Sequence, residues 1–266
     1  MNLEIIHEVP EQYICCYPIV FVHGGYMGAW CWKPYFIPYF KSKGFECYAF
    51  SMRGHGNSEG FDRIKKHSFY DYVADLEQVV DGIGKKCILI GHSMGGAVVQ
   101  KYCEQHGDKV AAMILLSSPA PNGMGLATGI ELMGRGMGNV WSVTMFHQGI
   151  IKKEDYPEKF PFRWFFSDYM DQDEKLKYAR MMKRESDKAS KQITKRYVKE
   201  PSQLTMPKLV IGGEDDWYFA PSTQQATAAL YNVKAVIVPK IAHNVMVDKF
   251  WKDVADEIHK FLLNLL

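Results

Sequence analysis

A serine flanked by glycines is the residue whose surroundings most clearly indicate covalent chemistry. Ser93 lies in Gly-His-Ser-Met-Gly at residues 91–95, which fits the pattern Gly-x-Ser-x-Gly. That pattern is typical of a serine held at a sharp turn between a strand and a helix, where its oxygen can reach a carbonyl carbon. An apolar run at 87–90 precedes the turn and a helical pattern follows it, as the motif requires. We expect Ser93 to be a nucleophile; the alternative is a glycine-rich connection with an idle serine.

A serine hydroxyl needs a base to become a good nucleophile, and the base needs an acid that fixes its tautomer. The chain has nine histidines, and in a parallel α/β sheet reactive groups gather in the loops after the strands. His23, His55 and His243 follow predicted strands, whereas the pattern does not place His147. His243 alone comes after a carboxylate that itself follows a strand, which gives the chain order serine, acid, histidine. We expect His243 to be the base; a structural histidine is the alternative.

Two neighbouring residues are candidates for the acid. Asp215 and Asp216 both follow the predicted strand at 209–211. Successive side chains of an extended chain point in opposite directions, so only one of the two can face the histidine. The other, like Glu214, is then a solvated loop acid, and the residues alone leave the choice open.

Two backbone amides are expected to bind the oxyanion that forms when the serine attacks. Met94 follows the nucleophile and starts the helix, so its N–H points out of the helix end and the helix dipole helps. The second donor is expected from the glycine-rich turn at 23–28, where Gly25 is the best candidate. Loss of one such donor costs roughly 3–4 kcal/mol of transition-state stabilisation in studied enzymes.

These residues need a parallel sheet to bring them together, and the chain predicts one. Strands are predicted where β-branched and aromatic residues run together, and helices where apolar residues recur at helical spacing. Weaker apolar pieces within 2–16 are expected to be strands at the sheet edge. The alternation predicts an α/β fold, a mostly parallel central sheet with helices on both faces. The main predicted strands are 18–22, 45–51, 87–90, 110–116, 209–211 and 234–238, and the predicted helices include 29–43, 68–83, 221–231 and 248–266.

The pattern changes between residues 120 and 201, where no strand of comparable strength is found. An aromatic block lies at 160–169, where most side chains are expected to pack, and 171–190 is predicted as one charged helix. The Lys/Arg-rich run at 183–196, interrupted by Glu185 and Asp187, is interpreted as a solvated helical face. We expect a helical insertion over the sheet. Its glycines lack the spacing of a dinucleotide site; they are Gly123, Gly125, Gly129, Gly134, Gly136 and Gly138.

Composition argues against several classes of partner. The chain has 266 residues, 47% of them hydrophobic and 23% charged, and a net charge of +2, so nothing favours nucleic acid or an anionic membrane. The six cysteines form no Cys-x-x-Cys pattern; several lie in apolar runs and are expected to be small buried hydrophobes, and we expect a reducing compartment. Residues 1–10 do not resemble a signal peptide, and no stretch reaches the ~20 apolar residues of a spanning helix. We expect a cytoplasmic protein without a metal-ligand cluster; the oligomeric state is left open.

Together these motifs resemble the α/β-hydrolase superfamily over nearly the whole chain. The segments that carry the resemblance are 21–25, 53–58, 91–96, 212–216 and 242–243. The resemblance implies a serine-type catalytic triad of Ser93, Asp216 and His243. Asp216 is preferred over Asp215 because spacing in similar sequences favours it.

The resemblance also implies a division into domains. In the family, an insertion after the sixth strand of the core sheet forms a helical cap over the site. Residues 120–201 resemble this cap, and residues 1–119 and 202–266 are then the core domain.

Differences from some enzymes of this fold narrow the activity. Haloalkane dehalogenases and epoxide hydrolases use an aspartate nucleophile, where this chain has Ser93. Residues 23–32 resemble the plant methylesterase and hydroxynitrile-lyase branch. The lyases, however, have a threonine at the position of Gly24 and a lysine at that of Asn244. Both differences count against cyanohydrin cleavage.

The leading hypothesis is therefore a serine hydrolase that needs no cofactor and cleaves small, partly apolar carboxylic esters. Hydrolysis of C–C, lactone or amide bonds, or lyase chemistry, on the same triad are related alternatives. A small-molecule receptor that keeps the fold without turnover is the alternative from another class, since a fold does not fix a function.

Overall fold

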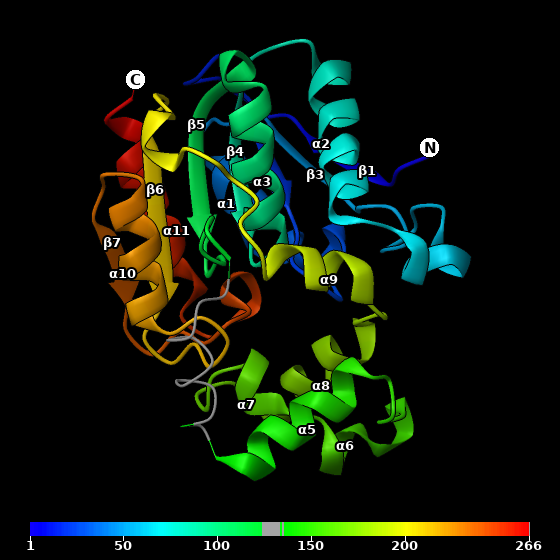
Figure 1. Cartoon of the computed structure of the whole chain (residues 1–266). Helices are drawn as coiled ribbons and strands as arrows, with labels where there is room; N and C mark the ends of the chain where they lie inside the picture. The colour runs from blue at the N-terminus through cyan, green and yellow to red at the C-terminus, as the bar shows by residue number, and fades with distance from the viewer. Residues whose placement is uncertain (124–133, 135, 266) are drawn as a thin grey trace.

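A seven-stranded sheet forms the centre of the protein, in the strand order β1-β3-β2-β4-β5-β6-β7 (Figure 1). The computed structural model describes residues 1–123, 134 and 136–265. β1 pairs antiparallel with β3 and all other pairings are parallel, so the expected α/β fold is confirmed. The strands are β1 (Ile5–Glu8), β2 (Ile19–Val22), β3 (Cys47–Phe50), β4 (Cys87–His92), β5 (Val110–Leu116), β6 (Lys208–Gly213) and β7 (Ala235–Val238).

Helices cover both faces of this sheet (Figure 1). On one face are α2 (Phe69–Ile83), α3 (Met94–Gln105) and α10 (Pro221–Leu230), and on the other are α1 (Phe36–Ser42) and α11 (Trp251–Leu263). Along β2, Ile19 and Phe21 pack toward α1 and α11, whereas Val20 and Val22 pack toward the opposite helices. Each of these side chains is fully buried, which explains the uninterrupted apolar run of this strand.

A helical insertion lies between β5 and β6, beyond the carboxyl ends of the parallel strands (Figure 1). The described residues between these two strands include no strand. Gly125 and Gly129 of the predicted glycine cluster lie outside the described residues. The division into a core (1–119 and 202–266) and a cap (120–201) stays a prediction. The helices of the insertion are α5 (Met137–His147), α6 (Tyr156–Lys159), α7 (Phe162–Phe165), α8 (Gln172–Met181) and α9 (Asp187–Ile193).

The single charged helix expected at 171–190 is wrong, because the chain breaks between α8 and α9. Met182 leaves the helical conformation (φ −65°, ψ 138°). The Lys183 N–H then donates to the Tyr26 carbonyl at 2.8 Å instead of continuing the helix. The break turns Glu185 inward, where it is 3% exposed, so its expected place on a solvated face is also wrong.

Other differences concern the ends of elements. Residues 13–16, expected to be a strand, are irregular and lie outside the sheet. The helix expected at 29–43 is a 3-10 turn (Ala29–Trp32) followed by α1. Pro34 lies between the two pieces and lacks the N–H that a continuous helix needs.

Two further observations concern solvent and membrane exposure. All six cysteines are free thiols, and all except Cys16 are buried, as expected for small hydrophobes. Within the described part of the chain, no helix combines the length and apolar character needed to cross a membrane.

Candidate active site

Ser93 occupies the sharp turn between β4 and α3. Its backbone has φ 51° and ψ −121°, a conformation that is rare and strained for a residue with a side chain. A β-carbon on Gly95 would lie 2.3 Å from the Val22 carbonyl oxygen, and one on Gly91 would lie 2.6 Å from that of Gly95. The glycines are therefore required by the close approach of backbone, as the motif predicts.

The structure brings Ser93, His243 and Asp216 together at the carboxyl ends of β4, β6 and β7. His243 Nε2 lies 3.0 Å from Ser93 Oγ. His243 Nδ1 lies 3.0 Å from Oδ2 and 3.1 Å from Oδ1 of Asp216. The carboxylate requires a proton on Nδ1, which leaves the Nε2 lone pair free to accept the serine proton. This is the arrangement of a nucleophile, a base and an orienting acid.

The neighbouring acid points elsewhere. Asp216 is fully buried, and its Oδ1 also accepts hydrogen bonds from the N–H groups of Tyr218 (2.8 Å) and Phe219 (2.9 Å). Asp215 is exposed. Partial desolvation of its carboxyl group and the charge of Glu214 raise its pKa. Geometry thus separates the two candidates that the residues alone left open.

The two predicted amide donors flank the same space. Met94 is the first residue of α3, and N–H groups in the first turn of a helix have no partner inside the helix. Gly25 follows β2, and both residues line a cavity that also reaches Ser93 and His243. Their role as oxyanion donors stays a prediction.

Neutral histidines hold the backbone around the site. His23 Nδ1–H donates to the Gly24 carbonyl at 2.7 Å, and its Nε2 accepts from the Met52 N–H at 2.9 Å. Burial, together with the nearby His55, lowers the pKa of His23 to about 3. His92 donates from Nε2 to the backbone carbonyl of His243 at 2.8 Å and so holds the backbone of the base in place. Burial lowers the pKa of His92 too.

The loop that carries His243 is tied to the insertion. The Asn244 N–H donates to the Phe165 carbonyl at 2.9 Å. The buried Asp248 accepts from Ser167 Oγ at 2.9 Å and from the Ala242 N–H at 3.3 Å, and burial raises the pKa of Asp248. The position of the base therefore depends on contacts from both sides of the cavity.

The cavity above Ser93 has a volume of about 340 Å³ and a mostly apolar lining. Trp164 and Phe165 from the aromatic block contribute to it; Phe160 and Phe166 are buried as expected, whereas Tyr169 is 51% exposed. Further lining side chains come from α5, α9 and the loop after β6; they include Val140, Val143, Ile193, Tyr218 and Phe219.

One polar pair in this lining was missed by the sequence reasoning. His147 Nε2 lies 2.6 Å from the Tyr218 hydroxyl, and burial lowers the pKa of His147 to about 4. The Tyr218 ring also lies 4.6 Å from the His243 ring, centre to centre. No motif surrounds either residue, so only the fold could have paired them.

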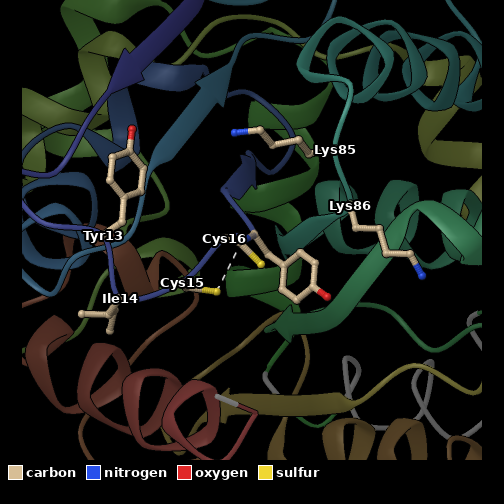
Figure 2. A pocket seen from close by; sticks show the side chains of 7 residues that line it. Tyr13, Ile14, Cys15, Cys16, Lys85 and Lys86 are labelled. Carbon is tan, nitrogen blue, oxygen red and sulfur yellow. Dashed lines mark hydrogen bonds between the residues drawn. The ribbon is translucent and has the colours of Figure 1, made fainter.

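A second hollow lies at the other end of the sheet. It is a surface groove of about 660 Å³ lined by residues 13–17, Lys85 and Lys86, which precede β2 and β4. Figure 2 shows that the amino groups of Lys85 and Lys86 point away from each other. Among the described residues, no three or more His, Cys, Asp or Glu side chains come together as a group that could hold a metal ion.

Comparison with known proteins gives a consistent result. A sequence model described as the alpha/beta hydrolase family matches residues 19–257. Epoxide hydrolase 3 of Xenopus tropicalis is 27% identical over 106 residues, which are 40% of this chain and 29% of that protein. Polyneuridine aldehyde esterase of Rauvolfia serpentina is 33% identical over 106 residues, 39% of each chain. The aligned stretches thus cover well under half of the length of either relative.

Among solved structures, that of Rv0554 from Mycobacterium tuberculosis has a TM-score of 0.80 at 18% identity. The superposition covers 99% of this chain and 94% of that one. At this level of identity the likeness shows a shared fold and nothing more.

Proposed function

The chain belongs to the alpha/beta hydrolase family, and we propose that it is a serine hydrolase that cleaves carboxylic esters through an acyl-enzyme. The observation that carries the proposal is the continuous set of hydrogen bonds from Asp216 through His243 to Ser93, with 3.0 Å at each step. It ends at a serine whose strained backbone lies at the bottom of an apolar cavity.

In the first half of the reaction, Ser93 Oγ attacks the ester carbonyl carbon while its proton moves to His243 Nε2. Nδ1–H stays bonded to Asp216, which stabilises the imidazolium. The carbonyl oxygen takes the electron pair of the broken π bond and becomes an oxyanion, held by the N–H groups of Gly25 and Met94. When the intermediate collapses, the ester C–O bond breaks and the imidazolium gives its proton to the leaving alcohol oxygen.

Water completes the cycle. His243 Nε2 removes a proton from water as the water oxygen attacks the acyl carbon, and a second oxyanion forms in the same place. Its collapse breaks the bond to Ser93 Oγ, which recovers its proton from His243, and the carboxylic acid leaves. The sequence of steps balances with water as the only co-reactant.

The cavity supports a small, partly apolar substrate. Its volume of about 340 Å³ is at the lower end of the range for ligand pockets, and aromatic and branched side chains dominate its lining. The esterase among the relatives supports ester chemistry. Epoxide opening through a carboxylate nucleophile is not supported, because the nucleophile position of this chain holds Ser93 and not an aspartate. Cyanohydrin cleavage is not supported either. The threonine that the lyases have at the position of Gly24 does not fit here, because its β-carbon would lie 2.5 Å from His92 Nδ1.

A panel of p-nitrophenyl esters from acetate to dodecanoate tests the proposal. We expect steady hydrolysis with an optimum at short or medium acyl chains, and loss of turnover in Ser93→Ala. Thermal stabilisation by the esters without any release of p-nitrophenol would favour the non-catalytic receptor instead. Equal rates for the wild type and Ser93→Ala would show that a different group carries the chemistry.

A further inference from the structure

Glu185 is a buried carboxylate in the break between α8 and α9, far in sequence from the residues it contacts. Oε1 accepts hydrogen bonds from the Tyr72 hydroxyl at 2.7 Å and from the Ser186 N–H at 2.6 Å. Oε2 accepts from His55 Nε2 at 3.0 Å and from the Tyr26 N–H at 3.3 Å. A buried carboxylate with donors at both oxygens is held in one orientation.

His55 is the charge partner of Glu185. Its Nδ1 lies 3.2 Å from the Arg53 carbonyl oxygen, and its Nε2 faces the Glu185 carboxylate. Because both ring nitrogens face acceptors, both carry protons and the ring is a cation. Burial acts against this charge, yet the carboxylate raises the pKa of His55. Conversely, burial acts against the charge of Glu185, yet His55 lowers the pKa of this carboxylate.

The same segment holds Tyr26 from both sides. Tyr26 has φ 66°, a left-handed conformation that a residue with a side chain adopts only when its surroundings impose it. Its N–H donates to Glu185 Oε2, and its carbonyl accepts from the Lys183 N–H at 2.8 Å. Residues 183–185 therefore impose this conformation.

Tyr26 directly follows Gly25, the expected oxyanion donor. A β-carbon on Gly25 would lie 3.2 Å from Glu185 Oε2, so the carboxylate is packed against this residue. On the amino side, the Gly24 carbonyl, which shares a peptide plane with the Gly25 N–H, accepts the hydrogen bond from His23 Nδ1. The Gly25 N–H thus lies in a peptide plane that His23 holds, and the next plane, which carries the Tyr26 N–H, is held by Glu185; release of that second plane lets the Gly25 N–H turn.

We propose that Glu185 is a positioning residue, whose carboxylate sets the direction of the Gly25 amide by holding the Tyr26 N–H. We call residues 23–28 the oxyanion loop. Through Glu185, the segment between α8 and α9 completes this loop from the insertion side. The cation of His55 also offsets a negative charge that would otherwise oppose an oxyanion nearby. This inference rests on the proposed function for its kinetic consequence, while the contact itself can be measured without activity.

Glu185→Gln breaks the contact with little change in shape. The Ser186 N–H contact at 2.6 Å is much shorter than the Tyr26 N–H contact at 3.3 Å, so the amide oxygen of glutamine is expected to take the place of Oε1. The amide NH₂ then occupies the place of Oε2 and faces the Tyr26 N–H, donor against donor. Tyr72→Phe is the matched control, because it removes a hydrogen bond to Oε1 and leaves the bond from Tyr26 intact.

Amide hydrogen exchange of the peptide that spans the oxyanion loop is the direct measurement. We expect faster exchange at Tyr26 in Glu185→Gln and wild-type exchange there in Tyr72→Phe, with both variants folded by circular dichroism. Unchanged exchange in Glu185→Gln would overturn the proposal whether or not the protein is an esterase. Faster exchange in Glu185→Gln, together with a wild-type protein that hydrolyses no ester, would leave the contact standing and contradict the proposed function alone.

Kinetics separate positioning from general support of the fold. With p-nitrophenyl acetate we expect kcat of Glu185→Gln to fall about tenfold or more with little change in KM, since loss of a whole oxyanion donor costs about 10²–10³. Ser93 adds to the carbonyl of a trifluoromethyl ketone and an oxyanion forms. This ketone should bind to Glu185→Gln more weakly by the same factor. The corresponding alcohol should bind as before. Parallel weakening of ketone and alcohol, or equal losses in Glu185→Gln and Tyr72→Phe, would show a structural role only.

Discussion

The two ends of the sheet differ in how their side chains are held. The groove at the amino end is the larger, about 660 Å³, and its tyrosines lie exposed beside lysines that point apart (Figure 2). The cavity at the carboxyl end is about 340 Å³, and hydrogen bonds link Asp216 through His243 to the hydroxyl oxygen of Ser93. In this protein, volume is a poor guide to a reactive site. Buried polar groups that converge are the better guide.

The sharpest difference between the two ends is expected from the acid of the triad. Asp216→Asn should lower kcat for p-nitrophenyl esters by about 10⁴, because an amide can no longer fix the proton on His243 Nδ1. The exposed neighbour gives a matched control, and Asp215→Asn should stay within about twofold of the wild type. Equal losses in the two variants would mean that the acid has been assigned to the wrong residue.

Filling the cavity should change substrate choice by less. Val143 on α5 is 6% exposed and lines the cavity. In Val143→Trp, kcat/KM for p-nitrophenyl octanoate should fall about 10–100-fold relative to that for the acetate, because the longer acyl chain loses its space. Trp141→Ala changes a residue of the same helix that is 66% exposed and should preserve the ratio. A ratio unchanged in Val143→Trp would place the acyl chain elsewhere.

Lowering the pH should reduce the stability of the fold through His147, which lines the cavity. Burial lowers the pKa of His147 from 6.5 to about 4, so the unfolded chain binds a proton first as pH falls. Stability from this group is therefore lost between pH 6.5 and about 4. In His147→Gln the loss between pH 7 and 4.5, measured by urea unfolding, should be smaller by about 2 kcal/mol. An identical loss in wild type and variant would contradict a buried neutral His147.

The smallest effect is expected at the amino end. Lys85→Ala combined with Lys86→Ala removes both lysines of the groove, and kcat/KM for the ester panel should remain within about twofold of the wild type. A large loss of activity in this double variant would make the groove part of the site and remove the contrast between the two ends.

Features set by neighbours in sequence were predicted well. β5 begins and ends where the apolar run at 110–116 predicts, and α2 matches the helix predicted at 68–83, with Ser68 at its start accepting from the Asp71 N–H. The turn at Ser93 belongs to this class only in part, because Gly91 is needed by contacts with Gly95 and Gly96 inside the motif, whereas Gly95 is needed by the distant carbonyls of Val22 and His23.

Features set by distant neighbours were predicted only where a rule linked them. The order serine, acid, histidine allowed Ser93 and His243 to be paired across 150 residues. No such rule exists for Glu185, which meets the Tyr26 N–H across 159 residues and was interpreted as solvated because basic residues surround it. An acid within a basic run was the single available signal, and burial could not be read from it.

Labelling by an active-site fluorophosphonate tests the central claim most directly. The wild-type protein should gain one phosphonyl group, located by peptide mass spectrometry on Ser93, and Ser93→Ala should gain none. His243→Ala should label far more slowly, since the hydroxyl then lacks its base. A folded wild-type protein that stays unlabelled, or a label on any other residue, would contradict the account.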